Sequence, residues 1–437
     1  MSLKRLDKAL LLLLLAALLV RLPFLFIVPM VEAPDEYAHF WVTRFLVENW
    51  AAPNAQQVAD GGPSAVYGSL PPFGYLPHVL FCHLIPGLDI SFSERVGSIL
   101  GGLVTVFAAF KISALVFAGN PFLRVALPLC VALHPQLVYV NAYCNSDSTA
   151  CALASLLLLT GMIQIFRGPR LRYAGLSGAL CAFIALSKFS ALAVVPVIFF
   201  AILAASYIHR MTAAQTLFRL GLTAASACLI CLPWFARNAA VFSGDWLGTN
   251  TMRQTWATTF HRSLASVSVF SVLKQKVWWQ QLFCSFWAVY GYQKHYLPAA
   301  FYIGYLLSIV IAVAGTFTKI SQNIRMKTMP IIFFRRADND AGESLKQQAA
   351  WLSLGLSATL SWAGLLYAAV NNLGGPQGRY LFPSEIAFLA IILYGLTALS
   401  EKWGRWLVFA FIGVNAITLF YSMILLYSMF GVRVKPY

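Results

Sequence analysis

Apolar stretches of about twenty residues recur along the whole chain and are separated by shorter polar connections. A stretch of this length can cross a bilayer as a helix. The alternating polarity of membrane strands is absent from the sequence, so helices are the spanning elements predicted. The fold class predicted is therefore all-α, a polytopic transmembrane protein with about eleven spans. We place these spans at residues 9–30, 95–117, 122–143, 148–166, 173–187, 189–208, 215–235, 297–318, 349–370, 383–400 and 406–428.

The connections between the spans differ in charge. Basic residues gather in alternate connections, at Lys4, Arg5, Lys8, Arg167, Arg170, Arg172, His209, Arg210, Lys319, Arg325, Lys327, Arg335, Arg336, Lys402 and Arg405. Because basic connections stay in the cytoplasm, we predict a cytoplasmic amino terminus and a cytoplasmic loop at 319–346. Two long loops, 31–94 and 236–296, then lie on the outer side. We expect one membrane-embedded domain over residues 1–437, with interfacial helices in the first outer loop.

Composition supports this assignment and limits the other classes of function. The chain is 59% hydrophobic and only 11% charged, with a mean hydropathy of +0.72, whereas soluble domains carry about 25% charged residues. Its net charge of +16 is spread over short connections. Membrane orientation and anionic headgroups therefore explain it better than nucleic acid does. Apolar neighbours surround Cys228 and Cys231, which argues against a metal or redox site there.

An acidic pair follows the first predicted span, in the sequence APDEYAHF. Pro34 and the first-turn acids Asp35 and Glu36 are typical of a helix start. However, apolar surroundings would desolvate these carboxylates, and charges near the membrane usually mark a site. On a helix, His39 would share a face with both acids. A carboxylate beside an imidazole can act as a general base on a hydroxyl group.

Three more polar residues fall on the same predicted side: Asp147 in NSDS, Lys188 in LSKFS and Arg237 in PWFARN. Asp147 and its neighbour Asn145 can cap the next helix, which is compatible with a second role for the carboxylate. Lys188 either snorkels from a helix end or holds a phosphate group. Arg237 follows the interfacial Trp234, an arrangement typical of a membrane anchor.

A late glycine-rich segment, GGPQGRYLFP, presents Arg379 with Tyr380 beside it. Gly374, Gly375 and Gly378 permit close backbone approach and positive φ angles. Arginine binds phosphate through two parallel hydrogen bonds and stays charged in apolar surroundings. We therefore favour a phosphate ligand at Arg379 over a purely structural anchor.

Several common site motifs are absent from the sequence. It contains no P-loop, no G-x-S-x-G elbow and no H-E-x-x-H, so nucleotide hydrolysis, serine-esterase and zincin chemistry have no support. No pair of interrupted spans repeats between the two halves, which weakens the case for a transporter.

The order and sidedness of these motifs resemble the GT-C superfamily of membrane glycosyltransferases. The shared features are an acidic pair after the first span, a Pro-Pro segment in SLPPFGYLPHVL, a second acid after the third span and a late GRYLFP. Within the superfamily, PDEYAHF, PWFARN and QGRYLFP are most similar to a family of bacterial membrane proteins of unknown function.

The resemblance implies an inverting glycosyltransferase of the bacterial inner membrane that takes one sugar from a polyprenyl phosphate. The acceptor would be an extracytoplasmic glycan, lipid or protein such as a pilin, and the site would face the periplasm. Asp35 would be the catalytic base, with Glu36 as the alternative. The residues implied in substrate binding are His39, Asp147, Lys188, Arg237, Arg379 and Tyr380.

Other interpretations stay open at this point. Acidic pairs also bind divalent metals, but a monophosphate donor does not require one, so no metal or other cofactor is predicted. The alternative functions are an oligosaccharide ligase with a lipid diphosphate donor, a flippase or transporter for lipid-linked sugars, and a non-catalytic subunit of an envelope complex.

Overall fold

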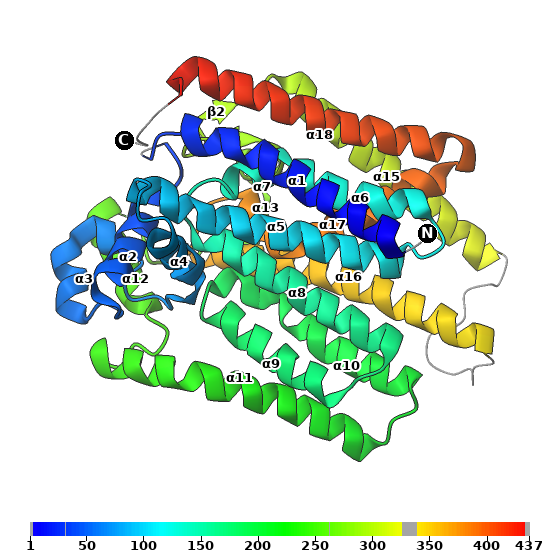
Figure 1. The fold of residues 1–437 in the computed structure, drawn as a ribbon, viewed down its shortest axis with the longest axis horizontal. Helices are drawn as coiled ribbons and strands as arrows, with labels where there is room; N and C mark the ends of the chain where they lie inside the picture. Colours follow the sequence, from blue (N-terminus) through cyan, green and yellow to red (C-terminus); the bar gives the residue numbers. More distant parts are fainter. Residues whose placement is uncertain (1–2, 31, 262, 326–338, 433–437) are drawn as a thin grey trace.

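The computed structural model describes residues 3–30, 32–261, 263–325 and 339–432. Over these ranges, nine helices are long and apolar enough to cross a membrane, and they run side by side along the longest axis of the molecule (Figure 1). The polytopic all-α fold predicted from the sequence is confirmed. The helices concerned are α1 (Leu3–Ile27), α5 (Ile90–Val116), α8 (Ser146–Arg167), α10 (Pro196–Ile208, after the 3₁₀ helix η3, Phe189–Val194), α11 (Ala213–Val241), α15 (Ala299–Arg325), α16 (Asn339–Val370), α17 (Glu385–Leu399, after the 3₁₀ helix η4, Gly378–Ser384) and α18 (Glu401–Phe430).

At two of the eleven predicted spans the structure has helices that are shorter than the others, so the number of crossings is not confirmed. The span expected at 173–187 is α9 (Leu171–Ala185), and that expected at 122–143 is divided into α6 (Pro121–Leu133) and α7 (Pro135–Val140). The division falls at His134 because Pro135 lacks an N–H group and disfavours helical geometry in the residue before it.

Small residues allow the closest helix contacts. A side chain at Gly395 of α17 would collide with the backbone of Ala312 in α15, and one at Gly178 of α9 would collide with the backbone of Thr223 in α11. Such contacts are typical of helices that pack within a membrane. Helices α11 and α18 form opposite edges of the bundle in Figure 1, and α11 exposes apolar side chains such as Leu217 and Phe218.

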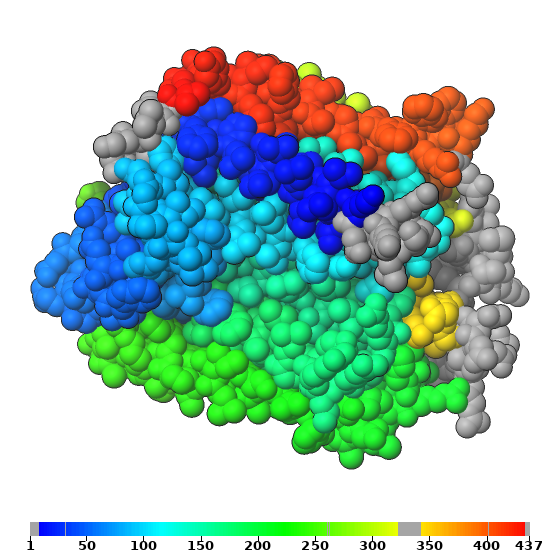
Figure 2. Space-filling model, in the orientation of Figure 1, coloured from blue at the N-terminus to red at the C-terminus, as the bar shows by residue number. Residues whose placement is uncertain are grey.

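The two long connections fold against one end of the bundle, which we call the site end. The first contains α2 (Glu36–Asn49), α3 (Ala55–Gly61), η1 (Gly62–Ala65), η2 (Phe73–Tyr75) and α4 (Leu76–Leu84). Figure 2 shows these blue segments packed together over the end of the bundle. With nine residues, α4 is only about 14 Å long, too short to cross a bilayer.

The second long connection contributes more short elements to the site end. They are α12 (Thr249–Phe260), α13 (Val269–Leu273), α14 (Lys276–Trp287) and an antiparallel hairpin of β1 (Val289–Tyr290) and β2 (His295–Tyr296). The hairpin was not expected from the sequence. Of the loop predicted at 319–346, residues 326–338 lie outside the described part of the chain.

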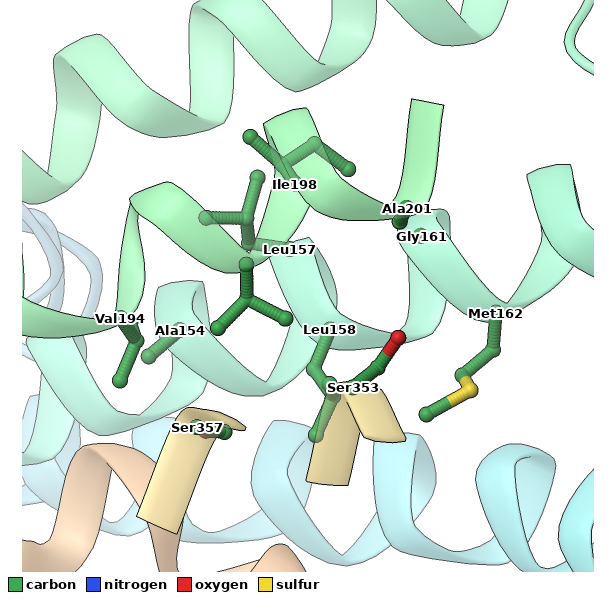
Figure 3. A pocket seen from close by; sticks show the side chains of 11 residues that line it. Ala154, Leu157, Leu158, Gly161, Met162, Val194, Ile198, Ala201, Ser353 and Ser357 are labelled. Carbon is green, nitrogen blue, oxygen red and sulfur yellow. The ribbon is translucent and has the colours of Figure 1, made fainter. Parts of the chain in front are cut away.

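A small cavity of about 10 Å³ lies inside the bundle between α8, α10 and α16. Figure 3 shows apolar side chains such as Leu157 and Ile198 around it, together with Ser353 and Ser357. Both serine hydroxyl groups already have hydrogen-bond partners within the protein, the Ala349 carbonyl and the Ser384 hydroxyl group. The cavity is thus a packing gap with room for about one water molecule.

Candidate active site

Four charged side chains from distant parts of the sequence meet at the site end. Arg379 Nη2 donates to Asp35 Oδ2 at 2.8 Å, and Lys188 Nζ lies 2.7 Å from Asp147 Oδ1. The two pairs are linked because Arg379 Nη1 lies 3.9 Å from Asp147 Oδ2. We call this alternating row of acids and cations the charged cluster. Its two carboxylates and two cations sum to zero net charge.

Asp35 is held in an unusual backbone conformation. It is the N-cap of α2, with φ 61°, in the left-handed region that most side chains avoid. Its N–H group donates to the Tyr292 hydroxyl oxygen in the β1–β2 turn at 3.1 Å, and its carbonyl accepts from the N–H of His39 at 3.1 Å. Strained residues of this kind cluster at functional sites.

Arg379 is positioned by the close approach of η4 to α14. A side chain at Gly378 would collide with the backbone of Phe286, and the Gly378 N–H donates to the Ser285 hydroxyl oxygen at 2.9 Å. Arg379 follows directly, only 7% exposed, and its Nη1 also donates to the Tyr143 hydroxyl oxygen at 3.1 Å. Gly378 therefore permits the close backbone approach that the sequence predicted, whereas none of Gly374, Gly375 and Gly378 has the positive φ angle that was also expected.

Asp147 and Lys188 come from neighbouring helix ends. Asn145 caps α8, since its side chain accepts from the N–H of Ser148 at 2.9 Å, so Asp147 stands in the first turn. Lys188 lies between α9 and η3. Acids are favoured at a helix N-terminus, and here the carboxylate also meets a cation. The position of Asp147 is therefore compatible with the second role that the sequence analysis allowed for its carboxylate.

The prediction of one shared face for Asp35, Glu36 and His39 is wrong. Because α2 begins only at Glu36 and Asp35 has a left-handed backbone, the two acids lie in different surroundings. Glu36 is fully buried and forms a bidentate pair with Arg95, with distances of 2.7 Å from Arg95 Nε to Oε1 and 2.6 Å from Nη2 to Oε2. It also accepts from the N–H of Cys144 at 2.9 Å.

The Glu36–Arg95 pair joins several elements of the site end. Arg95 Nη1 donates to the carbonyls of Leu25 and Val28, where α1 ends. Every strong partner of Glu36 is therefore structural, and the geometry gives no support to its use as an alternative base.

Replacing Glu36 with Gln should destabilise the protein strongly. The change leaves the Arg95 charge buried without its counter-ion, which costs about 3–5 kcal/mol. We expect a large fall in the thermal unfolding midpoint of the purified protein and lower abundance in membranes. Glu48→Gln is the matched control, because that acid lies on the same helix in an exposed pair with Arg44, where the loss is about 0.5 kcal/mol. Equal stability of the two variants would contradict the structural role.

The remaining predicted site residues fall into three positions. Tyr380 lies beside the charged cluster, its ring centre 5.8 Å from Lys188 Nζ. His39 is buried, stacks on Tyr67 with ring centres 4.6 Å apart, and shares a 2.7 Å hydrogen bond with the Tyr75 hydroxyl group. Arg237 lies apart from the cluster: it donates to the carbonyls of Ala52 and Pro53 at 2.9 and 2.6 Å. Its geometry is that of an anchor.

A polar cavity of about 470 Å³ opens beside Asp35 and Arg379. It is lined by Pro34, Asp35, Tyr37, Ala38, Pro63, Val66, Tyr67, Gln136, Tyr143, Trp256, Ser285, Val289, Tyr292, Gln293, Gly374, Gly375, Gln377, Gly378, Arg379 and Tyr380. The Asp35 side chain is 34% exposed, so a molecule in the cavity can reach its carboxylate.

An apolar groove of about 460 Å³ lies close to the polar cavity. Ser285 and Arg379 line the polar cavity, whereas their near neighbours Phe286 and Leu381 line the groove. The groove also takes side chains from α14, α15, α16 and α17, and Thr316 is its one polar lining residue among those described. The exposed Phe317 at its margin, which lies on a predicted spanning helix, indicates that it opens toward lipid.

Charge shapes the ionisation of the groups near the cavity. Burial alone would raise the pKa of the Asp35 carboxyl, but the Arg379 guanidinium, with a smaller effect from Lys188, holds that pKa below its usual value. Burial, together with Lys188, lowers the pKa of His39 to about 3 against the opposing effect of the two acids. Asp35 is therefore ionised and His39 neutral near pH 7.

Two buried atoms of the charged cluster lack a hydrogen-bond partner among the described residues, Arg379 Nε and Asp147 Oδ2. One is a donor and the other an acceptor. Buried polar groups are normally satisfied, so one donor and one acceptor of the cluster are left unused in this geometry.

Sequence reasoning missed several lining residues. Tyr67, Trp256 and Tyr292 come from the two long connections of the site end, where aromatic residues are also expected simply as interfacial anchors. Their separation along the chain hides their proximity. For Glu36, the sequence feature that could have indicated a buried ion pair was Arg95, a cation at the start of a predicted span.

Known proteins resemble this chain in structure rather than in sequence. No family model matches the sequence, and no curated protein matches it significantly. The structure is similar to ArnT from Cupriavidus metallidurans bound to undecaprenyl phosphate, with a TM-score of 0.53 and 16% identity over 97% of this chain and 76% of ArnT. It is also similar to the Archaeoglobus fulgidus oligosaccharyltransferase in complex with zinc and sulfate, with a TM-score of 0.52 and 13% identity over 94% of this chain and 53% of the other. The chain therefore has the GT-C fold of polytopic membrane glycosyltransferases, as the resemblance in sequence predicted.

Proposed function

We propose that this protein is an inverting glycosyltransferase that moves one sugar from a polyprenyl phosphate to an acceptor outside the cytoplasm. The single observation that carries the proposal is the contact between a partly exposed carboxylate, Asp35, and a buried arginine, Arg379, at the edge of a polar cavity. The first can take a proton and the second can hold a phosphate group. The fold shared with ArnT, which binds undecaprenyl phosphate, supports the same conclusion.

The chemistry requires one bond to form as another breaks. The acceptor hydroxyl oxygen attacks the anomeric carbon of the sugar from the face opposite the phosphate, and its proton passes to Asp35. The bond between the anomeric carbon and the phosphate oxygen breaks, and the electron pair leaves with the polyprenyl phosphate. Arg379 and Lys188 stabilise the negative charge that develops on the leaving group.

Substrate binding also prepares the base. Arg379 is shared between Asp35 and Asp147 in the charged cluster, and a donor phosphate would compete with both acids for it. Once the guanidinium turns to the phosphate, Asp35 loses its strongest cationic neighbour and becomes a better proton acceptor.

The polar cavity and the apolar groove suit the two ends of such a donor. A sugar phosphate fits the polar cavity, and an isoprenoid chain fits the apolar groove, whose lining residues Phe286 and Leu381 lie close in the chain to Ser285 and Arg379 of the cavity. Burying hydrocarbon there stabilises the complex by about 25 cal/mol per Å² of apolar surface. Because the cluster supplies two cations, we propose that transfer needs no metal.

Analysis of envelope glycans tests this function directly. In a strain that lacks the protein, we expect one sugar to be missing from an envelope glycan and a polyprenyl-phosphate sugar to accumulate. The wild-type protein should reverse both changes. The site is proposed to face the periplasm of the inner membrane, so the acceptor should be found outside the cytoplasm.

Other outcomes would favour the alternative functions. Loss of a complete glycan with accumulation of a lipid diphosphate would indicate an oligosaccharide ligase. A lipid-linked sugar trapped on the cytoplasmic leaflet, and released by a variant without the Asp35 carboxylate, would indicate a flippase. Unchanged glycans would contradict the proposal.

A further inference from the structure

The wall of the polar cavity is unusually rich in aromatic rings. Six of its lining residues are aromatic: Tyr37, Tyr67, Tyr143, Trp256, Tyr292 and Tyr380. Flat rings pack against the C–H faces of sugars, while their polar atoms stay available to hydroxyl groups. On this basis, and resting on the proposed function, we infer that the acceptor presents a neutral sugar ring, which binds against Tyr67 and Trp256.

These two rings form a fixed edge of the cavity. Their centres lie 6.1 Å apart with an angle of 78° between the planes. Trp256, on α12, packs together with Tyr67 against a small core made by Ala38, Val66 and Met252. A site whose rings are held by packing loses little entropy when a ligand binds.

The aromatic edge lies close to the proposed base. His39 stacks on Tyr67 with ring centres 4.6 Å apart, and the His39 N–H donates to the Asp35 carbonyl at 3.1 Å. Asp35, Tyr67 and Trp256 line the same cavity. A sugar ring on this edge can therefore direct a hydroxyl group toward the Asp35 carboxylate.

The charges of the cavity favour an uncharged acceptor. Among the described residues that line it, Asp35 and Arg379 alone carry a formal charge, and they are paired with each other. The other polar groups are hydroxyl groups and the amides of Gln136, Gln293 and Gln377. A phosphorylated acceptor would bring a second anion with no further cation on the wall, and its desolvation would be uncompensated.

Direct binding measurements test this inference without any transfer reaction. The purified protein, in lipid nanodiscs with undecaprenyl phosphate, is offered neutral di- and trisaccharides, sugar phosphates of the same size and a serine-containing peptide, with saturation-transfer NMR as readout. We expect binding of neutral sugars, weakened about tenfold in Trp256→Ala and largely retained in Trp256→Phe. Trp246→Ala is the matched control, because that half-exposed tryptophan lies outside the cavity lining.

A second measurement separates folding and donor binding from acceptor binding. Undecaprenyl phosphate binding is measured for each variant, and Trp256→Leu, which keeps apolar packing without a flat ring, replaces Trp256→Ala if the latter does not bind the lipid. Tighter binding of sugar phosphates or peptide, equal sugar binding by Trp256→Leu, or no sugar binding by a protein that binds the lipid would overturn the acceptor inference alone. Failure of the wild-type protein to bind the lipid would instead count against the proposed function.

Discussion

Asp35→Asn should abolish nearly all sugar transfer while leaving the protein folded. Removing a general base lowers a rate by roughly 10²–10⁴-fold. Asparagine has nearly the same shape as aspartate and is among the residues that best tolerate a left-handed backbone, so the φ of 61° at this position can persist. The N–H contact with Tyr292 involves only the backbone of residue 35 and is also kept.

The rate is measured in membranes with the donor that accumulates in the deletion strain. Asp60→Asn is the matched control, since that acid lies on α3 in the same long connection and contacts the exposed Gln56. Its rate should equal that of the wild type. Transfer by Asp35→Asn at the wild-type rate, in protein made at normal levels, would show that Asp35 is not the base.

Arg379→Gln should have the second largest effect. The substitution removes the cation closest to Asp35 and one of the two proposed phosphate ligands, and loss of one such group costs roughly 10²–10³-fold in rate. Arg379→Lys keeps the charge but not the planar fork, so it should retain an intermediate rate. Lys294→Ala is the control for a lost positive charge at the site end, because Lys294 is exposed and lies outside the cavity lining.

The pH dependence of the rate distinguishes this role from a purely structural one. A base works only when unprotonated, and Arg379 holds the pKa of Asp35 below its usual value of about 3.9. The wild-type rate at low donor concentration, which reports the protein before a phosphate engages Arg379, should therefore stay constant as the pH falls, until it drops near or below that value. In Arg379→Gln, burial remains without the opposing cation, so the acid limb of the residual rate should move to higher pH. An unchanged acid limb would contradict the coupling between the two side chains.

The sequence was sufficient for the nine long apolar helices and for the members of the charged cluster, but not for the number of crossings or for the geometry of the cluster. Hydrophobic length predicts spanning helices because the bilayer imposes it, and isolated charges such as Lys188 and Arg379 stand out against an apolar background. By contrast, the different environments of Asp35 and Glu36 depend on one left-handed backbone angle and on a distant arginine, Arg95. Neither follows from a helical periodicity.

The two long connections of the site end were the least predictable part. Their aromatic residues, such as Trp256, fit both interfacial anchoring and a cavity wall, and only tertiary packing separates the two. The β1–β2 hairpin is also a product of context, since two-residue strands such as Val289–Tyr290 have no periodic signal of their own. Its turn nevertheless supplies Tyr292, the contact that holds the backbone of Asp35.

The neutrality of the charged cluster has a consequence for selectivity in the cell. Each cation already has an internal counter-ion, at 2.8 Å for Arg379 and 2.7 Å for Lys188, so an empty site offers little attraction to free inorganic phosphate or sulfate. Displacing these carboxylates costs free energy, so an anion binds only if other contacts offset that cost. Burial of hydrocarbon in the apolar groove is such a contact. On the proposed function, we therefore expect the site to discriminate against water-soluble anions, and the spent lipid carrier to leave once Asp35 and Asp147 pair again with Arg379 and Lys188.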